Sequence, residues 1–271
     1  MASLYDQLTF RNIGIFTQKE QDKLRNSCVA IAGVGGVGGL LAERLIRIGV
    51  ENLCITDPGR FEPTNFNRQF GSTMKTVDMN KAEAVYAELH AINPYAAIDY
   101  DGKGIHSQED ACRLVEKADV IVDEMDFPML KESLYLQRAA REKGIYYIFS
   151  AALGFGCVAS VFSPDGYTLE EYNGLPKGAD LTQFVPGRIS MDKVSSRLPS
   201  YAFDSVSQEH VNKMIEGKAP ISTNSIGVGL TSILTANETV NVLLQKRPIV
   251  TAPDYILVDL LDRHYTVERR I

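Results

Sequence analysis

The feature that most constrains the fold is a strand, a glycine-rich turn and a helix in direct succession. A short apolar run, Cys28 to Ala32, predicts a buried parallel strand. The turn that follows it contains four closely spaced glycines: Gly33, Gly35, Gly36 and Gly38. Leucine and isoleucine then recur at helical spacing until Gly49, where the helix ends. Such glycines allow close backbone approach, and the helix N-terminus offers free N–H groups to a phosphate, so we expect a nucleotide site here.

A carboxylate stands at the end of the next predicted strand. Asn52 to Thr56 form a second apolar run, and Asp57 follows it. This acidic residue comes about 20 residues after the glycine turn, where nucleotide-binding folds place the carboxylate that hydrogen-bonds the ribose. Asp57 is therefore the predicted ribose ligand.

The rest of the chain alternates between strand and helix signals, which indicates the fold class. Apolar runs predict further strands at 96–100, 118–122, 145–150 and 157–163, and amphipathic stretches predict helices at 78–93, 107–117 and 130–143. The alternation is typical of an α/β fold with a doubly wound, mostly parallel, Rossmann-like sheet. Helices at 208–216 and 221–244 and strands at 255–259 and 264–268 predict a C-terminal α+β extension.

We expect a single domain over residues 1–271. Its nucleotide-binding part covers about 10–160, and its substrate and dimer part covers about 161–271. The segment at 164–220 has little regularity and is too long for a structureless loop, so it is functional or partly helical. The long apolar stretch at 221–244 is interrupted by asparagines and Glu238, which favours a buried helix at a subunit interface over a membrane span.

Composition and charge exclude several function classes. The chain is 45% hydrophobic and 23% charged with a net charge of -6, which argues against binding DNA or an anionic membrane. The start of the chain lacks a signal-peptide pattern, so we expect a cytoplasmic protein. In that reducing compartment the four scattered cysteines are expected to be small buried residues. No C-x-x-C pair occurs, so no zinc site is expected.

Polar side chains gather in the loop at 61–71. Asn65, Asn67, Arg68 and Gln69 alternate there with phenylalanines, a mixture that is unusual for a plain surface loop, so we expect a site role. Lys81 falls in the first turn of the following helix, whose predicted cap is Asp78. A lysine in that turn opposes the helix dipole, and a bound anion would offset this cost.

Three aspartates lie beyond the carboxyl ends of predicted strands, where open α/β sheets bind ligands. They are Asp57, Asp123 and Asp126. Carboxylates at this edge suit a Mg²⁺ ion that bridges phosphates. Arg11 precedes a helix that is predicted to begin at Thr17. Arg11 is either an ordinary surface residue or a cation that an N-terminal arm delivers to a neighbouring active site.

Taken together, the glycine turn, the ribose carboxylate, two cations and a metal carboxylate exceed the needs of a redox dinucleotide site. They fit a nucleoside triphosphate whose charge must be neutralised for attack at phosphorus. The chain lacks the G-x-x-x-x-G-K-[ST] pattern, so this is not a P-loop site.

These residues resemble the adenylating domain of the ThiF/MoeB/HesA family, relatives of the ubiquitin-activating enzymes. The resemblance rests on Gly33 to Gly38, Asp57, Asn65 to Gln69, Lys81 and Asp126, which follow one another in the family's order. It covers about residues 10 to 160 well and the remainder loosely. It implies an enzyme that binds ATP with Mg²⁺ and adenylates a carboxylate, with release of pyrophosphate.

The resemblance also implies roles for the site residues. The glycine turn and Asp57 would hold ATP; Asn65, Arg68, Gln69 and Lys81 would address its phosphates; and Asp126 would hold magnesium. Arg11 resembles an arginine that homodimers of this family donate to the partner's site. The carboxylate would belong to a peptide, to a small ubiquitin-like carrier protein or to a tRNA-linked substrate.

The chain departs from the family pattern in three respects. The two zinc-binding C-x-x-C pairs are absent, and no cysteine occurs at 168–220, where many members carry a nucleophilic thiol. Cys157 precedes that region in a strand and is a poor nucleophile candidate. Phe127 stands where many members have asparagine. We therefore expect adenylation without a catalytic cysteine.

Two alternatives remain open. A non-catalytic ATP-binding partner subunit of the same fold would account for the missing cysteine and for Phe127. An NAD-dependent oxidoreductase would use the glycine turn and Asp57, but it would leave Arg68, Lys81 and Asp126 without a role.

Overall fold

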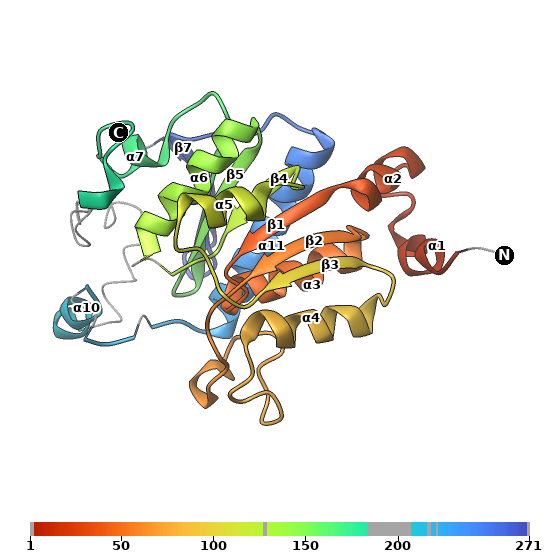
Figure 1. Cartoon of the computed structure of the whole chain (residues 1–271), viewed down its shortest axis with the longest axis horizontal. Coiled ribbons are helices and arrows are strands. Elements are labelled where there is room, and N and C mark those ends of the chain that lie inside the picture. Colours follow the sequence, from red (N-terminus) through yellow and green to blue (C-terminus); the bar gives the residue numbers. More distant parts are fainter. Residues whose placement is uncertain (1–2, 127–128, 184–206, 216–217, 221, 270–271) are drawn as a thin grey trace.

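Eight strands form one mixed sheet in a computed structural model that describes residues 3–126, 129–183, 207–215, 218–220 and 222–269. The strand order is β3-β2-β1-β4-β5-β6-β7-β8 (Figure 1). Five neighbouring strands are parallel: β3 (Ala97–Asp101), β2 (Asn52–Thr56), β1 (Cys28–Ala32), β4 (Val120–Asp123) and β5 (Tyr146–Leu153). Three antiparallel strands complete the sheet: β6 (Gly156–Phe162), β7 (Asp254–Asp259) and β8 (His264–Arg269). The predicted fold class is confirmed.

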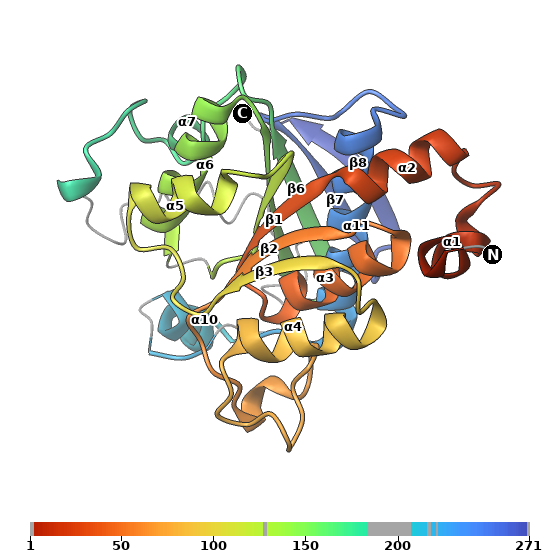
Figure 2. The same cartoon turned by 45° about the vertical axis from the view of Figure 1, so that its right-hand side comes forward.

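Helices cover both faces of the sheet (Figures 1 and 2). One layer consists of α3 (Gly36–Ile48), α4 (Lys81–Ile92) and the long α11 (Ser225–Leu244). The opposite layer consists of α5 (Gln108–Val115) and α6 (Leu130–Lys143), with the short α7 (Leu169–Tyr172) beside α6. Alternate residues of β1 point to opposite layers: Val29 and Ile31 pack with α3, whereas Ala30 and Ala32 pack with α5 and α6. Burial on both faces explains why the strand sequence is continuously apolar.

The N-terminal segment forms α1 (Leu4–Thr9), η1 (Phe10–Asn12) and α2 (Gln18–Asn26) at one end of the sheet (Figure 2). As predicted, α2 is capped by Thr17, whose hydroxyl accepts from the Glu20 N–H. The remaining described elements are η2 (Pro63–Asn65), η4 (Leu181–Gln183) and α10 (Gln208–Ile215).

The start of α4 differs from the sequence prediction. Asp78 adopts a positive φ of 66° and lies outside the helix, so it is not the cap. Asn80 takes that position, and its Oδ1 accepts from the Glu83 N–H. The side-chain amide of Asn80 also donates to the Asp57 carbonyl oxygen over 3.0 Å. The same asparagine therefore places the first turn of α4 beside the predicted ribose ligand.

The buried helix α11 contains several threonines, and two of them bond to the backbone of the helix itself. The hydroxyls of Thr231 and Thr239 each donate to the carbonyl oxygen four residues earlier. These bonds satisfy the hydroxyls internally, so the helix can bury them against the sheet. No helix in the described part of the chain is long and apolar enough to cross a membrane.

Two glycines provide a matched test of the turn. A Cβ at Gly38 would collide with the Gly33 carbonyl oxygen, whereas a Cβ at Gly229 in α11 would meet open space. We expect Gly38→Ala to lower the melting temperature by at least about 4 °C, because the turn must open. Gly229→Ala should leave the melting temperature unchanged or raise it, since alanine favours the helix. Differential scanning fluorimetry compares the two, and equal melting temperatures would contradict the packing described here.

Candidate nucleotide site

The glycine turn lies at the carboxyl end of β1 and leads directly into α3. Gly33 has a φ of 86° and donates its N–H to the Thr56 carbonyl oxygen over 2.8 Å. A Cβ at this position would lie 2.6 Å from the Glu124 carbonyl oxygen, so only glycine fits between β2 and β4. Gly35 occupies the cap position of α3 and offers no side-chain acceptor. The first N–H groups of α3 are therefore available to an anion.

Asp57 connects the end of β2 to the glycine turn. Its Oδ2 accepts from the Val34 N–H over 2.9 Å, and its Oδ1 accepts from the Gly59 N–H over 2.8 Å. The carboxylate is buried, yet each oxygen retains a further lone pair after these bonds. The residue thus holds the turn in place and can still accept from ribose hydroxyls.

The polar loop is shaped from within by Asn65. This buried residue accepts the Glu62 N–H on its Oδ1, and its carbonyl oxygen accepts from the N–H groups of Arg68 and Gln69. Asn67 donates its side-chain amide to the Thr223 carbonyl oxygen over 3.1 Å. That bond ties the loop to the residues that precede α11.

The side chain of Arg68 extends from the polar loop toward the start of α3. Its Nη1 donates to the Thr64 carbonyl oxygen and to Asn67 Oδ1, over 3.2 and 2.8 Å. A Cβ at Gly36 would lie 3.8 Å from Arg68 Cγ. Burial lowers the pKa of Arg68, and the nearby carboxylate of Asp126 opposes this effect. A partly desolvated guanidinium beside a helix N-terminus is suited to bind phosphate.

Gln69 presents an amide position that has no partner. Its Oε1 is buried and accepts no hydrogen bond, and a Cβ at Gly35 would lie 3.6 Å from it. An amide oxygen and nitrogen exchange places when the group turns by 180°, so this position can offer either an acceptor or a donor. An unpaired buried amide costs free energy unless a ligand completes it. The residues present therefore fit a polar ligand against the glycine turn.

Lys81 opens α4 on the other side of Asp57. Its N–H donates to the Gly59 carbonyl oxygen over 2.9 Å. A Cβ at Gly59 would lie 3.3 Å from Lys81 Cε and 3.0 Å from Asp57 Oδ1. The lysine stem therefore runs over Gly59 toward the same edge of the sheet.

The two aspartates that follow β4 have different surroundings. Asp126 is exposed, and its carbonyl oxygen accepts from the Met129 N–H. Asp123 is fully buried: Oδ2 accepts from the Tyr147 hydroxyl over 2.5 Å, and Oδ1 accepts from the Met125 N–H over 2.9 Å. Burial raises the pKa of Asp123. The suggestion that Asp123 binds magnesium is therefore wrong, because its oxygens belong to the core, whereas Asp126 remains available.

Arg11 lies away from the site of its own chain. Tyr5 donates its hydroxyl to the Gly49 carbonyl oxygen, and Asn12 donates its amide to the Ile48 carbonyl oxygen. Both bonds attach the N-terminal segment to the last turn of α3. The glycine turn lies at the opposite end of this helix, roughly 20 Å away for 13 residues. The structure brings the other predicted residues together but leaves exposed Arg11 apart from them.

The described residues also show the surroundings of Cys157 and whether side chains gather to bind a metal ion. Cys157 is fully buried, and burial raises the pKa of its thiol to about 12, which makes it a poor nucleophile. No group of three or more His, Cys, Asp or Glu side chains that could hold a metal ion is found among the residues described. Phe127 and most of the irregular segment, 184–206, lie outside the described residues.

Glu124 is a residue of the site that the sequence patterns missed. Its carbonyl oxygen touches the glycine turn, and its N–H donates to the Ala32 carbonyl oxygen over 2.8 Å. Its Oε1 accepts from the Ser150 hydroxyl over 2.5 Å, and Thr235 of α11 donates to Ser150 over 2.8 Å. Burial raises the pKa of Glu124 well above its ordinary value. A lone acidic residue between two aspartates carries no periodic signal that could reveal this chain of bonds.

Glu124 predicts a pH dependence of stability. A carboxyl whose pKa rises on folding stabilises the native state below its ordinary pKa of 4.5, and this contribution is lost as pH rises toward the native pKa. Glu124→Gln removes the titration. From pH 5 to 7 we therefore expect the free energy of unfolding of the variant, measured in urea, to rise relative to that of the wild type. The rise should be up to about 1.4 kcal/mol per pH unit. The exposed Glu142→Gln variant is the control, and parallel stability curves for all three proteins would contradict the raised pKa of Glu124.

Fold and site together define an α/β protein of the Rossmann-like type with its glycine turn at the carboxyl edge of a mixed sheet. The chain belongs to the ThiF family, whose model matches residues 9–270.

Curated relatives match over shorter segments. The chain is 41% identical over 73 residues to tRNA threonylcarbamoyladenosine dehydratase of Bacillus subtilis (strain 168), which is 27% of this chain and 29% of that protein. It is 38% identical over 81 residues to ubiquitin-like modifier-activating enzyme 5 of Drosophila ananassae, which is 30% of this chain and 20% of that protein. Each of these two matches therefore spans less than a third of the relative.

Solved structures match over most of the chain. Crystalline PaaA superposes with a TM-score of 0.72 at 15% identity, over 99% of this chain and 74% of that one. Escherichia coli MccB in its complex with ATP superposes with a TM-score of 0.69 at 18% identity, over 92% of this chain and 65% of that one. At these identities the likeness shows a shared fold.

Proposed function

We propose that this chain binds ATP with Mg²⁺ and adenylates a carboxylate with release of pyrophosphate. The observation that carries the proposal is the convergence of cationic, acceptor and open N–H groups at one edge of the sheet. Membership of the ThiF family and the fold shared with MccB, whose structure with ATP is known, support it. The groups are Gly33, Gly35, Gly36, Gly38, Asp57, Asn65, Arg68, Gln69, Lys81 and Asp126.

The proposed roles follow from the positions of these groups. The N–H groups at the start of α3 face the phosphate chain, and Asp57 accepts from the ribose. Arg68 and Lys81 neutralise the charge that develops at the α-phosphorus and on the leaving pyrophosphate. Gln69 donates or accepts through its unpaired amide position. Asn65 acts by holding Arg68 and Gln69 in place.

The proposed adenylation requires no covalent intermediate with the protein. An oxygen of the substrate carboxylate attacks the α-phosphorus in line with the departing pyrophosphate, so positioning and charge neutralisation provide the catalysis. Mg²⁺ would add charge neutralisation on the phosphates, with Asp126 as the carboxylate that holds it. One protein carboxylate is sufficient for this ion when substrate phosphates complete its shell.

The substrate class is a carboxylate on a peptide, a small carrier protein or a tRNA-linked group. One relative is named for a tRNA-linked threonylcarbamoyl group and another for ubiquitin-like modifiers. The high thiol pKa of Cys157 and the lack of any cysteine at 168–220 favour release of the acyl adenylate to an external nucleophile over transfer to an enzyme thiol.

Exchange of radiolabelled pyrophosphate into ATP tests the proposal. With a panel of peptides and carrier-protein tails, we expect exchange that Lys81→Ala and Asp126→Ala reduce roughly 100-fold or more, since each removes charge stabilisation at the reacting phosphates. Lys75→Ala changes an exposed lysine of the neighbouring loop and should leave the rate unchanged.

Three results would contradict the proposal. Failure to bind ATP with magnesium would exclude both the enzyme and a non-catalytic ATP-binding partner subunit. Tight NADH binding in its place would favour an oxidoreductase. ATP binding that neither Lys81→Ala nor Asp126→Ala affects would place the nucleotide elsewhere.

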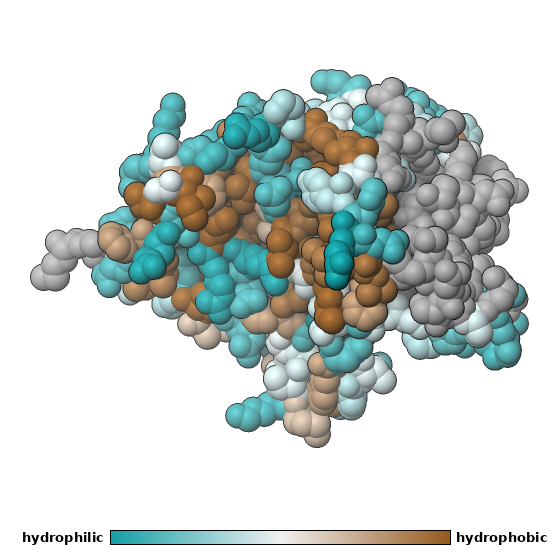
Figure 3. Space-filling model, turned by 180° about the vertical axis from the view of Figure 1, so that it is seen from behind, coloured by the Kyte–Doolittle hydropathy of each residue, from teal (hydrophilic) through white to brown (hydrophobic). Residues whose placement is uncertain are grey.

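We further propose that the active form is a homodimer in which Arg11 serves the partner's site. The helix α11 exposes Ile226 and Ile233, of which 52% and 56% are accessible, and apolar side chains gather on the face shown in Figure 3. Such contiguous apolar surface is typical of an interface. The N-terminal arm carries a second exposed group, Phe10 and Ile15, next to Arg11. Because the arm is attached at the far end of α3, Arg11 is exposed there to a second subunit and not to its own site.

Mixed dimers test the trans role. Arg11→Ala and Asp126→Ala chains, each inactive alone, are co-expressed with different tags. Random pairing makes half of the dimers mixed, and each mixed dimer contains one site with both residues, so about a quarter of wild-type exchange activity should return. If Arg11 acted within its own chain, neither site of the mixed dimer would be complete and no activity would return. A monomer in light scattering at micromolar concentration would also contradict the proposal.

A further inference from the structure

Two thiols lie side by side on the face of the sheet that α5 and α6 cover. Cys28 begins β1, and Cys54 lies on β2, two positions beyond the residue that pairs with Cys28. Residues two apart on a strand point to the same face. The two Sγ atoms are 3.9 Å apart, within hydrogen-bonding distance for sulfur. Both residues are only partly buried, so the expectation that every cysteine is a buried core residue is wrong for this pair and for exposed Cys112.

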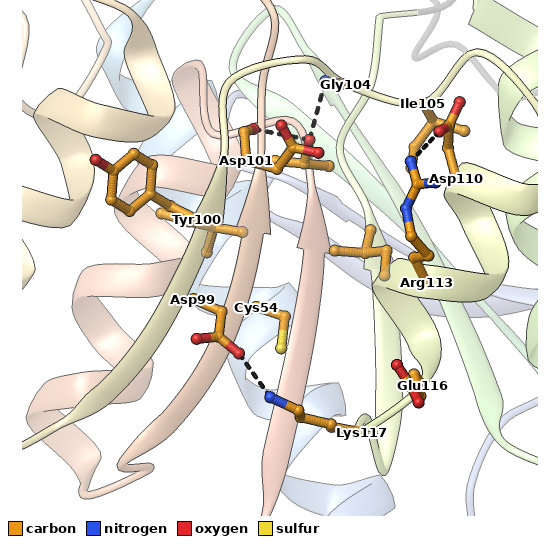
Figure 4. Close-up of a pocket in the computed structure, with 13 residues that line it drawn as sticks. Cys54, Asp99, Tyr100, Asp101, Gly104, Ile105, Asp110, Arg113, Glu116 and Lys117 are labelled. Carbon is orange, nitrogen blue, oxygen red and sulfur yellow. Dashed lines mark hydrogen bonds and ion pairs between the residues drawn. The ribbon is translucent and has the colours of Figure 1, made fainter.

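A cavity gives solvent access to Cys54. It has a volume of about 200 Å³ and lies between the face of β2 and β3 and the helix α5 (Figure 4). Cys54 contributes to its floor, and Asp99 of β3 stands beside Cys54 in register. Lys117 reaches across the opening to Asp99, with 3.0 Å between Nζ and Oδ2. The cavity is large enough for a small polar molecule and is separate from the glycine turn.

The charges around the pair make the two thiols unequal. A hydrogen bond from the Cys28 thiol lowers the pKa of Cys54, and the ammonium groups of Lys117 and Lys143 act in the same direction. Burial and the carboxylate of Asp99 oppose them. The same hydrogen bond raises the pKa of Cys28. Cys54 also lines the cavity, whereas Cys28 does not, so we assign Cys54 as the thiolate and Cys28 as its protonated neighbour.

We propose that Cys54 and Cys28 form a modification site for hydroperoxides, in which Cys54 is the attacking thiolate and Cys28 the resolving thiol. A partly exposed thiolate with a second thiol in contact is the arrangement that selects a cysteine for reversible oxidation. Cys112 is more exposed but has no second thiol beside it among the described residues, and Cys157 is buried. Cys54 is therefore distinguished from Cys112 and Cys157 because it is partly exposed and has a second thiol in contact.

The reaction balances without a further redox partner. The Cys54 thiolate attacks one oxygen of the peroxide, the O–O bond breaks, and the departing oxygen takes up a proton to leave as water or an alcohol. Cys54 is then a sulfenic acid. The Cys28 thiol attacks its sulfur, the S–O bond breaks, and water leaves with the Cys28 proton. Two thiols lose two electrons, the peroxide gains them, and the sulfurs move together by roughly 2 Å to reach bonding distance.

This site is independent of the proposed adenylation, because none of its residues takes part in the nucleotide site. The full chain is treated with hydrogen peroxide, and its four cysteines are followed by thiol titration and by mass spectrometry of peptides. We expect the wild type to lose two thiols and to form a Cys28–Cys54 disulfide. Cys28→Ser should stop at Cys54 sulfenic acid, which dimedone traps.

Substitution at Cys54 and at Cys112 distinguishes activation from simple exposure. Cys54→Ser and Cys54→Ala should slow the peroxide-dependent loss of thiols at least 10-fold, whereas Cys112→Ser should behave as the wild type. Melting temperatures of the variants check that they are folded. Oxidation of Cys112 at the rate of Cys54, or a Cys28→Ser protein whose Cys54 remains reduced, would overturn the proposal.

Discussion

The structure around the nucleotide site depends on the carboxylate of Asp57. Its two oxygens accept from Val34 in the glycine turn and from Gly59 in the following loop. Without these bonds the buried Val34 N–H and the partly buried Gly59 N–H would lack these partners, which is costly. The Asp57 carbonyl oxygen accepts from Asn80, which in turn starts α4 and positions Lys81. One buried acid therefore determines where the turn, the loop and the lysine meet.

A second connection joins the nucleotide half of the molecule to the C-terminal half. Asn67 bonds to Thr223 just before α11, and Glu124 reaches α11 through Ser150 and Thr235. The surroundings of the glycine turn are thus bonded both to the sheet, at Ser150, and to α11, at Thr235.

Much of the fold follows from patterns that are local in sequence. The apolar runs that became β1 and β2 and the helix ended by Gly144 have the predicted bounds, because continuous burial and a left-handed glycine leave clear signals. The cap of α4 was predicted at the wrong residue, since both Asp78 and Asn80 are good caps and only the contact of Asn80 with Asp57 decides between them. Asp123 and Asp126 look alike in sequence, but Tyr147, 24 residues away, makes one of them a core residue. The contact between Cys28 and Cys54 depends on the register of β1 against β2, which the sequence alone does not predict.

The attachment of the N-terminal arm to the last turn of α3 has a kinetic consequence. If Arg11 completes the site of another subunit, a separated chain keeps its fold and its nucleotide contacts but lacks one catalytic charge. Specific activity would then rise with total protein and saturate once pairing is complete. The amount of protein in the cell would itself act as a threshold for turnover, without any added effector.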